Sequence, residues 1–281
     1  MSIITCPNCR SPLTPCEGSY CCTQGHAFDI AKEGYVNLLL PNKKKTLNPG
    51  DNKRMLRARE DFLSTGTFQF LIDEMDAQLQ RMIPHPEGVH VLDIGSGSGY
   101  YLRHILSEVA CQKIGLDISK NGMAMAAKRD KKSTYLVASA YDLPIAADSI
   151  DLVLNIFSPI DLDELSRVLK SGGFYLKVIP GSNHMREVAE LIYEKFIPHQ
   201  SEIEFKLSEL QEFSSLEIVD LEKKVTLNRE ELTSLISMTP YLYKFSDEQM
   251  KCLTGLRTTL SFQILIYRYS DVTGRMETKK E

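Results

Sequence analysis

Residues 91–100 read VLDIGSGSGY, and this stretch decides the fold. An apolar, strand-like segment runs into a turn with glycine at every second position, and a helix-like segment follows from Tyr100. Glycine has no Cβ, so such a turn lets the backbone pass against a ligand where any other residue would collide. We therefore predict a strand, a ligand-binding turn and a helix. The plainer alternative, in which the glycines only serve the geometry of the turn, stays open.

Two acidic residues and a polar turn distinguish this segment from a dinucleotide-binding turn. Asp93 lies at the end of the predicted strand, where a pyrophosphate would be repelled. Asp117 ends the next predicted strand, where its carboxylate could accept hydrogen bonds from both hydroxyls of a ribose. Residues 139–144 (SAYDLP) form a turn where an adenine ring would be bounded. These features favour a nucleoside ligand.

From Val89 onward the chain alternates strand-like and helix-like pieces, which predicts βαβ units, a mainly parallel sheet and an α/β fold. Ser119 and Asp161 are candidate helix caps, the latter in a capping box with Glu164. Residues 197–227 are polar and acidic, and we predict an irregular insertion or lid there, before a final antiparallel hairpin. The predicted strands cover residues 90–94, 113–116, 134–137, 152–155, 173–179 and 262–268. The predicted helices cover residues 100–109, 120–129, 162–169, 185–196 and 229–238.

Two further segments precede this α/β region. Residues 1–41 are rich in turns and cysteines and hold too few apolar side chains for a conventional core. Residues 42–86 open with a basic loop, after which apolar residues at spacings of three and four predict a helix over 73–82. The predicted domains are therefore residues 1–41, a basic linker and helical segment over 42–86, and residues 87–281 with an insertion near 197–245.

Five of the seven cysteines lie between Cys6 and Cys22. In a reducing compartment such a cluster indicates a metal before it indicates disulfides. Cys6, Cys9, Cys22 and His26 have the spacing Cys-x2-Cys-x12-Cys-x3-His, which can close a tetrahedron around zinc. Four protein ligands leave no open position, so this zinc would be structural and would supply folding energy that the small core lacks. Scattered free thiols are the alternative. Ligand choice also stays open between Cys22 and its neighbours Cys16 and Cys21, with Cys22 preferred for its distance from His26.

Composition and charge exclude several classes of protein. The chain is 43% hydrophobic and 25% charged, and no apolar run approaches the roughly 20 residues of a membrane span. The N-terminus shows no signal region, so we expect the chain in the cytoplasm. The formal net charge is −4, yet residues 1–60 carry +4. This basic part, with cations between Lys43 and Arg59, predicts contacts to the phosphates of a polyanionic partner. A solvated loop is the alternative for Lys43–Lys45.

The glycine turn with its two acids resembles the class I S-adenosylmethionine-dependent methyltransferases over residues 88–180. The resemblance implies a Rossmann-like domain with a mainly parallel, seven-stranded sheet and S-adenosylmethionine as cofactor. It implies that Gly95, Gly97 and Gly99 line the methionine part, that Asp117 holds the ribose, and that the backbone of Ala140 faces adenine N1. One departure is Ser139, because many members carry there an acid that reaches the adenine amino group.

The N-terminal half narrows the resemblance. The cysteine–histidine knuckle is followed by FDIAKEGYVNLL (28–39), and later by NIFSP (155–159) and PGSNH (180–184). Over nearly the full chain this pattern is similar to the bacterial 23S ribosomal RNA (guanine-N1)-methyltransferases. The family implies a homodimer that methylates N1 of a guanine in a hairpin loop of domain II of the RNA. It also implies one structural zinc on Cys6, Cys9, Cys22 and His26, and cofactor contacts from Gly99, Tyr100, His184 and Phe68, where relatives carry tyrosine.

Several alternatives remain at this stage. His184 follows Pro-Gly-Ser-Asn and could simply cap the next helix. No residue stands out as the base that removes the proton from guanine N1, whereas residues 155–159 are predicted to form a wall for the target base, with Phe157 as its aromatic face. A methyltransferase for a small metabolite such as a quinone would need only the α/β domain. A zinc-dependent RNA-binding protein without activity would leave Asp93–Gly99 and Asp117 unexplained.

Overall fold

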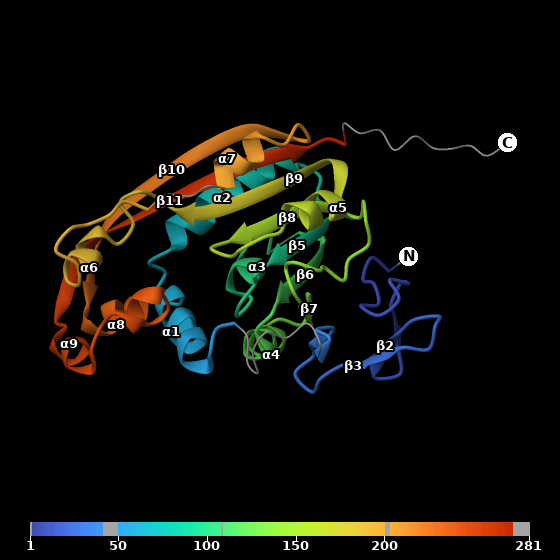
Figure 1. Cartoon of the computed structure of the whole chain (residues 1–281), viewed down its shortest axis with the longest axis horizontal. Helices are drawn as coiled ribbons and strands as arrows, with labels where there is room; N and C mark the ends of the chain where they lie inside the picture. Colours follow the sequence, from blue (N-terminus) through green and yellow to red (C-terminus); the bar gives the residue numbers. More distant parts are fainter. Residues whose placement is uncertain (1, 42–49, 108, 200–202, 272–281) are drawn as a thin grey trace.

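A computed structural model describes residues 2–41, 50–107, 109–199 and 203–271 of the chain. It contains a small antiparallel sheet near the N-terminus and one large mixed sheet (Figure 1). The small sheet has the order β1-β2-β3, and the large sheet has the order β10-β11-β9-β8-β5-β6-β7-β4. The small sheet comprises β1 (Thr14–Cys16), β2 (Ser19–Cys21) and β3 (Ala27–Asp29). The predicted α/β fold with a separate N-terminal cysteine-rich unit is confirmed.

The centre of the large sheet is parallel and buried on both faces, as its apolar strands require. β5 lies between β6 and β8, so the strand order reverses direction there. Ligands of open α/β sheets bind at such a switch point, beyond the carboxyl ends of the strands. The five central strands are β5 (His90–Ile94), β6 (Gln112–Asp117), β7 (Thr134–Val137), β8 (Ile150–Ile156) and β9 (Leu169–Pro180).

The large sheet has eight strands, one more than predicted. The additional strand is β4 (Val36–Asn37), which leaves the cysteine-rich segment and pairs in parallel with β7. A two-residue strand has no alternation of its own, so the sequence carried no signal for it. The segment is held further by an isolated bridge between Ile4 and Ile145 and by a 2.8 Å hydrogen bond from Thr5 N to the Pro144 carbonyl. The N-terminal unit is therefore docked on the edge of the large sheet.

The prediction of an irregular segment over 197–227 is wrong for its second half. β10 (Phe213–Asn228) pairs antiparallel with β11 (Gly255–Tyr269) along its length, and the two form the long antiparallel ribbon of Figure 1, joined through α8 and α9. β10 is an edge strand whose residues are mostly exposed, so a run of charged side chains conceals its pattern. The α7 helix (Ile203–Ser208) precedes it, and α8 (Arg229–Ser237) follows it.

The helices differ from prediction mainly at their ends. α3 (Tyr100–His104) stops five residues early because Ile105 is extended and Leu106 adopts a positive φ of 51°. α6 (Arg186–Glu190) is likewise shorter than predicted. α4 (Lys120–Arg129) has the predicted bounds. The remaining helices are α2 (Gln69–Met82), α5 (Leu162–Val168), α9 (Asp247–Cys252) and a 3-10 turn at Pro240–Tyr243.

Helix capping follows the sequence closely. Ser119 accepts a hydrogen bond from Gly122 N, and Asp161 accepts one from Glu164 N, as predicted. The reciprocal half of the Asp161 capping box is missing, because the Glu164 side chain accepts from Leu143 N instead. Across the described residues, no helix is long and apolar enough to cross a bilayer.

Among the described residues, three α-helices were not predicted: α7, α9 and, most important for the site, α1. α1 (Lys53–Leu63) begins after Asn52, whose side chain accepts hydrogen bonds from Arg54 N and Met55 N. Its apolar residues, Phe62 among them, all pack inward. The asparagine cap and this spacing were both visible in the sequence.

Candidate functional site

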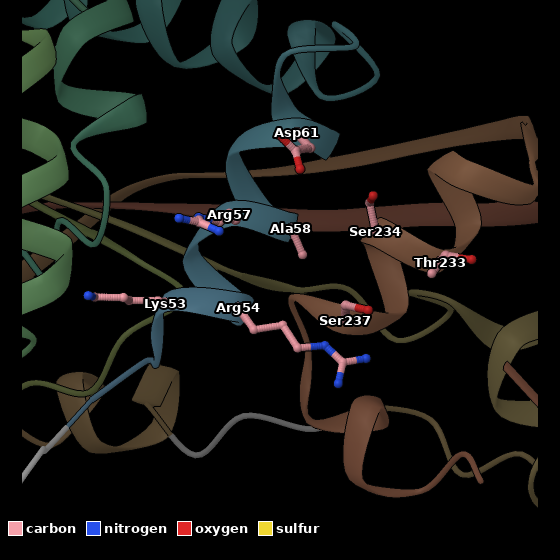
Figure 2. A pocket seen from close by; sticks show the side chains of 8 residues that line it. All are labelled: Lys53, Arg54, Arg57, Ala58, Asp61, Thr233, Ser234 and Ser237. Carbon is pink, nitrogen blue, oxygen red and sulfur yellow. The ribbon is translucent and has the colours of Figure 1, made fainter. Parts of the chain in front are cut away.

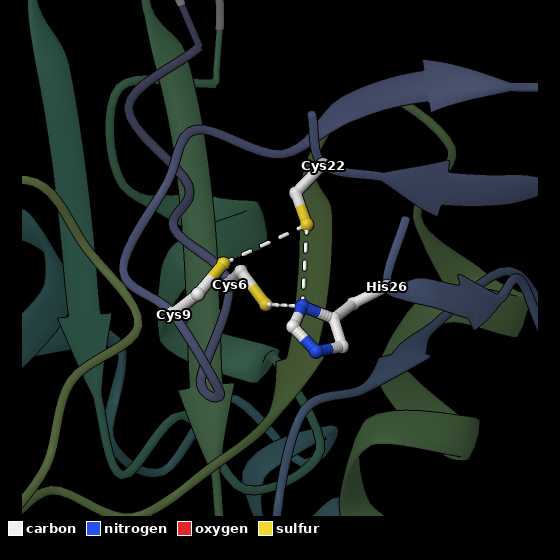
Figure 3. Close-up of side chains that lie close together, drawn as sticks. All are labelled: Cys6, Cys9, Cys22 and His26. Atoms are coloured by element: carbon white, nitrogen blue, oxygen red, sulfur yellow. Dashed lines mark hydrogen bonds between the residues drawn. The ribbon is translucent and has the colours of Figure 1, made fainter. Parts of the chain in front are cut away.

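The cysteine–histidine cluster converges on one point (Figure 3). Cys6 and Cys9 lie on the loop before β1, Cys22 follows β2, and His26 precedes β3. The four ligand atoms lie within 4.8 Å of one another. His26 Nδ1 is 3.6 Å from Cys6 Sγ and 3.4 Å from Cys22 Sγ, and the Cys9 and Cys22 sulfurs are 3.7 Å apart. Ligands at about 2.0–2.3 Å from a tetrahedral zinc lie about 3.5–3.8 Å apart, so this donor set fits the metal.

The other nearby cysteines are occupied elsewhere. Cys16 and Cys21 form a disulfide across the β1–β2 hairpin. Within the cluster, hydrogen bonds from the Ser11 side chain and backbone lower the pKa of Cys9 to about 6. Zinc binds the thiolate form, so a lowered pKa favours metal binding at neutral pH.

The glycine turn connects β5 to α3 and requires glycine at each alternate position. Gly95, Gly97 and Gly99 have φ values of 80°, 56° and 73°, a region that other residues rarely adopt. A Cβ on Gly95 would lie 2.2 Å from Ser158 Cβ, and one on Gly99 would lie 2.8 Å from Ala126 Cβ. The turn is thus packed against α4 on one side and the loop after β8 on the other.

Asp117 is held against the glycine turn by both of its oxygens. One oxygen accepts from Gly97 N at 2.9 Å, and the other accepts from Ser119 N at 2.7 Å. Burial raises the pKa of Asp117, and the two backbone hydrogen bonds oppose that rise. A carboxylate offers about four acceptor positions, so two remain for the hydroxyls of a ribose. The residues around the turn therefore fit an adenosine-type cofactor.

Asp93 lies beneath the turn and is fully buried. Burial raises the pKa of Asp93 to about 7, and the charge of Asp117 contributes to the rise. Asp93 therefore supports the turn from the core side.

The α1 helix covers the turn and was missing from the sequence prediction. Arg59 pairs with Asp51 at 2.5 Å and lies 3.4 Å from the Cβ position of Gly97. Glu60 accepts a 2.6 Å hydrogen bond from Ser98 Oγ and a 2.9 Å hydrogen bond from Arg103. These contacts bring a segment 38 residues upstream onto the turn, and no local pattern marks them.

Four aromatic side chains form a chain of contacts beside the turn. Phe262 lies 4.9 Å from Phe68, 4.8 Å from His184 and 5.5 Å from Phe157, measured between ring centroids. Phe157 has a φ of 53° and is 40% exposed, which is uncommon for a bulky residue and is typical of strained positions at functional sites. The structure therefore brings Phe68 and His184 together through Phe262, a residue that the sequence analysis did not single out.

His184 is a buried, neutral histidine. Burial lowers its pKa to about 3. Its Nδ1 lies 3.3 Å from Ser261 N and accepts from that amide, so the ring proton sits on Nε2. The histidine precedes α6 but its side chain caps no helix end, because the N-terminus of α6 has no side-chain cap.

A buried lysine supports the loop after β8. Lys177 donates to the Asn155 side chain and to the Ser158 carbonyl, and Tyr175 donates to the same Asn155 oxygen at 3.3 Å. Burial lowers the pKa of Lys177 to about 8. A single lysine within the apolar run FYLKVI was the available sequence signal. These contacts fix residues 155–159, and with them Phe157, against the turn.

Tyr100 and Ala140, the remaining predicted cofactor residues, lie beside the glycine turn and near Asp117, respectively. Tyr100 is buried, and its hydroxyl donates to the Leu63 carbonyl of α1 at 2.9 Å, so its ring joins α3 to α1. Ala140 is half-buried in the turn after β7, next to the Asp117 end of the sheet. The predicted lysines at 43–45 lie outside the described residues.

Sheet order, glycine turn and acidic residue at the end of β6 define a class I S-adenosylmethionine-dependent methyltransferase. Family models agree: residues 4–47 match the zinc ribbon described as "RlmA, N-terminal", and residues 92–176 match a methyltransferase domain. The chain belongs to the family of the 23S rRNA (guanine-N1)-methyltransferases, as comparison with curated relatives shows.

Three of these relatives can be compared directly. The 23S rRNA (guanine(748)-N(1))-methyltransferase of Streptomyces fradiae is 31% identical over 191 residues, which is 67% of either chain. A putative 23S rRNA (guanine-N(1)-)-methyltransferase of Bacillus subtilis (strain 168), YxjB, is 31% identical over 68% of this chain and 69% of its own. A putative enzyme of the same description from Micromonospora griseorubida is 28% identical over 84% of this chain and 85% of its own.

Proposed function

We propose that this protein transfers a methyl group from S-adenosylmethionine to N1 of a guanine in a hairpin loop of domain II of 23S ribosomal RNA. The observation that carries the proposal is that one chain combines two sites. A Cys3His zinc ribbon is attached to the large sheet through β4, and that sheet carries a glycine turn whose Gly97 N donates a hydrogen bond to Asp117. The names of the relatives support the RNA and the guanine nitrogen. An RNA substrate also favours a cytoplasmic location.

On the cofactor side, we assign each residue the role that its position allows. Asp117 would accept from the ribose hydroxyls with the lone pairs that Gly97 N and Ser119 N leave free. Gly95, Gly97 and Gly99 would line the methionine part, and the Ala140 backbone would face the adenine ring. Phe68 and His184 would close the pocket through their contacts with Phe262, and Tyr100 would contact the cofactor from the start of α3.

When bound, S-adenosylmethionine supplies an electrophilic methyl group on a sulfonium. The task of the chain is then to align the guanine nitrogen with that methyl. The strained, half-exposed Phe157 offers a stacking surface for a base that leaves its loop. Lys177 and Asn155 hold the loop of Phe157 from the core side, so the wall is fixed before the base arrives.

Incubation with tritiated S-adenosylmethionine tests the proposal. We expect label in a transcript of domain II of 23S RNA and none in a total metabolite extract. Reverse transcription should stop next to the modified guanine, because N1 methylation blocks base pairing, and replacing that guanine by adenine should abolish labelling. Label in metabolites alone would replace the RNA function with a small-molecule methyltransferase.

We also propose a homodimer, which the family resemblance implied. Sedimentation equilibrium of the purified protein should then give twice the chain mass of 31.8 kDa. A single-chain mass at micromolar concentration would contradict it.

A further inference from the structure

The outward side of α1 carries three cationic side chains at its start. Lys53, Arg54 and Arg57 are all exposed, and Lys53 and Arg57 are one helical turn apart and so lie on the same face. Figure 2 shows Lys53 and Arg57 extending from one side of the helix, while Arg54 extends from the side nearer Ser237 of α8. Glu60 lies three residues after Arg57 and therefore farther along the same side of α1, where its carboxylate accepts a hydrogen bond from Ser98 of the glycine turn.

Two grooves run along α1, and Lys53 and Arg57 line both of them. A groove of about 520 Å³ lies between α1 and α8 and adds Arg54 and the hydroxyl groups of Thr233, Ser234 and Ser237. A groove of about 620 Å³ lies between α1 and α4 and adds Lys120, Lys128 and Arg129. The two grooves form one cationic path that crosses α1 from α4 to α8.

The charge on this path is not compensated. Among the residues that the structure describes, no carboxylate lies within 4 Å of Lys53, Arg54, Arg57 or Lys120. Lys128 and Arg129 do have acidic partners, at 3.7 Å from Glu33 and 3.6 Å from Glu60, and Asp61 lines one groove. Four unpaired cations on one path of a chain with net charge −4 mark a site for a polyanion.

We infer that Lys53, Arg54, Arg57 and Lys120, here named the basic track, bind backbone phosphates of the RNA substrate. The inference rests on the proposed function and deepens it. The sequence pattern predicted phosphate contacts for the cations from Lys43 to Arg59, Lys53, Arg54 and Arg57 among them, but Arg59 is half-buried and pairs with Asp51. Lys120, by contrast, lies 67 residues beyond Lys53 and joins the track only through the packing of α4 beside α1.

The placement of the track explains how it serves the reaction. Phosphate contacts fix the position and register of a nucleic acid without reading its sequence. Because Lys53 and Arg57 lie one to two helical turns before Glu60, which accepts from Ser98 of the glycine turn, a strand held on the track lies about 5–10 Å along α1 from that contact. Binding at the track therefore positions the hairpin relative to the transferred methyl.

Charge reversal tests the track. The double variant Lys53→Glu/Arg57→Glu is compared with Arg81→Glu/Arg268→Glu, which changes the same number of charges at exposed positions on α2 and β11. Binding of a domain II transcript is measured from 50 to 300 mM salt. We expect the track variant to lose about 10- to 100-fold in affinity at 0.1 M salt and about two units of log–log salt slope, because each lost phosphate contact removes about one unit.

Methylation kinetics and cofactor binding complete the test. In the track variant KM for RNA should rise with kcat within about threefold, and cofactor affinity should match the parent. The control variant should resemble the parent in affinity and slope. A track variant with the parent's affinity and salt slope would overturn the basic track while leaving the proposed function intact.

The two proposals fail in distinguishable ways. A parent that binds RNA through the track but labels no guanine would support the track and overturn the proposed function. A parent that does not bind RNA would overturn both, as would a track that binds acidic protein partners in place of RNA.

Discussion

The zinc ribbon and the glycine turn are two ligand sites in one chain, built in opposite ways. In the ribbon, the ligand contacts are side chains, and Cys6, Cys9, Cys22 and His26 come from two loops of a small sheet, one before β1 and one between β2 and β3. In the glycine turn, the backbone itself would approach the ligand because the glycines have no side chains. The shape of the turn is set by packing of Gly95 against Ser158 and of Gly99 against Ala126. The zinc site therefore depends on the functional groups of four side chains, whereas the glycine turn depends on the absence of a Cβ at its glycines.

This difference predicts different responses to mutation. Removing one zinc ligand should abolish the metal site at once, because a tetrahedral site needs all four donors. Adding one methyl group to the turn should instead disturb the packed elements around it. The two sites are also coupled, because β4 and the Thr5–Pro144 hydrogen bond attach the ribbon to the large sheet.

The largest effect is expected from Cys9→Ser in the ribbon. Zinc contributes about 10–16 kcal/mol to the folding of small zinc units, so residues 1–41 should lose their structure and RNA methylation should fall at least 100-fold. Cofactor affinity should change much less, because the glycine turn lies in the other part of the chain. Elemental analysis, calorimetry with cofactor and the methylation assay measure the three quantities. Full zinc content in the variant would refute the ligand assignment.

Cys16→Ser is the matched control for that variant. Cys16 is bonded to Cys21 and lies outside the four-residue cluster. It should therefore keep one zinc per chain, although the β1–β2 hairpin loses its cross-link. Loss of zinc from Cys16→Ser would place the metal on a different set of sulfurs.

A smaller but sharper effect is expected from Gly95→Ala in the turn. The added Cβ meets Ser158 at 2.2 Å, and the residue has a φ of 80°. Strain and overpacking should each cost about 1–3 kcal/mol, seen as a lower melting temperature and weaker cofactor binding. Gly18→Ala, in the ribbon hairpin, is the control, because its φ of 71° is similar but nothing lies within 4 Å of its Cβ. It should cost about 1–2 kcal/mol from backbone strain alone. Equal losses in the two variants would contradict the packing argument.

Much of the fold was readable from the sequence where the signal is local. The bounds of β5, β7 and α4 are the predicted ones, because each is a short apolar or capped segment between clear breaks. The four zinc-site residues and the glycine turn were also found, since both sites depend on spacing within a single stretch.

The missed parts depend on contacts between distant segments. Glu60 and Lys177 support the turn and the loop after β8 from elements 38 and 19 residues away. β4 forms a strand only because it pairs with the edge of β7. β10 forms a strand only because it pairs with β11. Sequence spacing carries no record of such pairings, so β4, β10 and the groups around Phe157 needed the structure, whereas the asparagine cap and apolar spacing of α1 were visible in the sequence and were overlooked.

Asp117→Asn separates charge from shape at the cofactor site. Asparagine keeps the size of the side chain but has one acceptor oxygen, so one of Gly97 N and Ser119 N would face an NH2 group. Losing charge-assisted hydrogen bonds should cost about 1.5–3 kcal/mol, or about 10- to 150-fold in cofactor affinity by calorimetry. Zinc content should stay at one per chain. Unchanged cofactor affinity would remove Asp117 from the ribose site.

The smallest effect concerns pH and the buried Asp93. Its pKa is about 7 in the folded chain against an ordinary value of 3.8, because burial disfavours the charged form. Between these two values the folded state holds a proton that the unfolded state has released, so the free energy of unfolding falls as pH rises. From pH 6 to pH 7 the loss should be about 1 kcal/mol, and it should level off above pH 8.

Asp93→Asn isolates this contribution, because asparagine does not titrate. Denaturant unfolding of parent and variant between pH 5 and 8 gives the difference in unfolding free energy, which cancels the titration of every other group. The unfolding free energy of the parent minus that of the variant should fall as pH rises from 5 toward 8, because Asp93 ionises in this range. The ribbon should keep its zinc at each pH. A difference that stays constant over the whole range would mean that Asp93 is ionised throughout, and that the support beneath the turn is a charged group and not a neutral one.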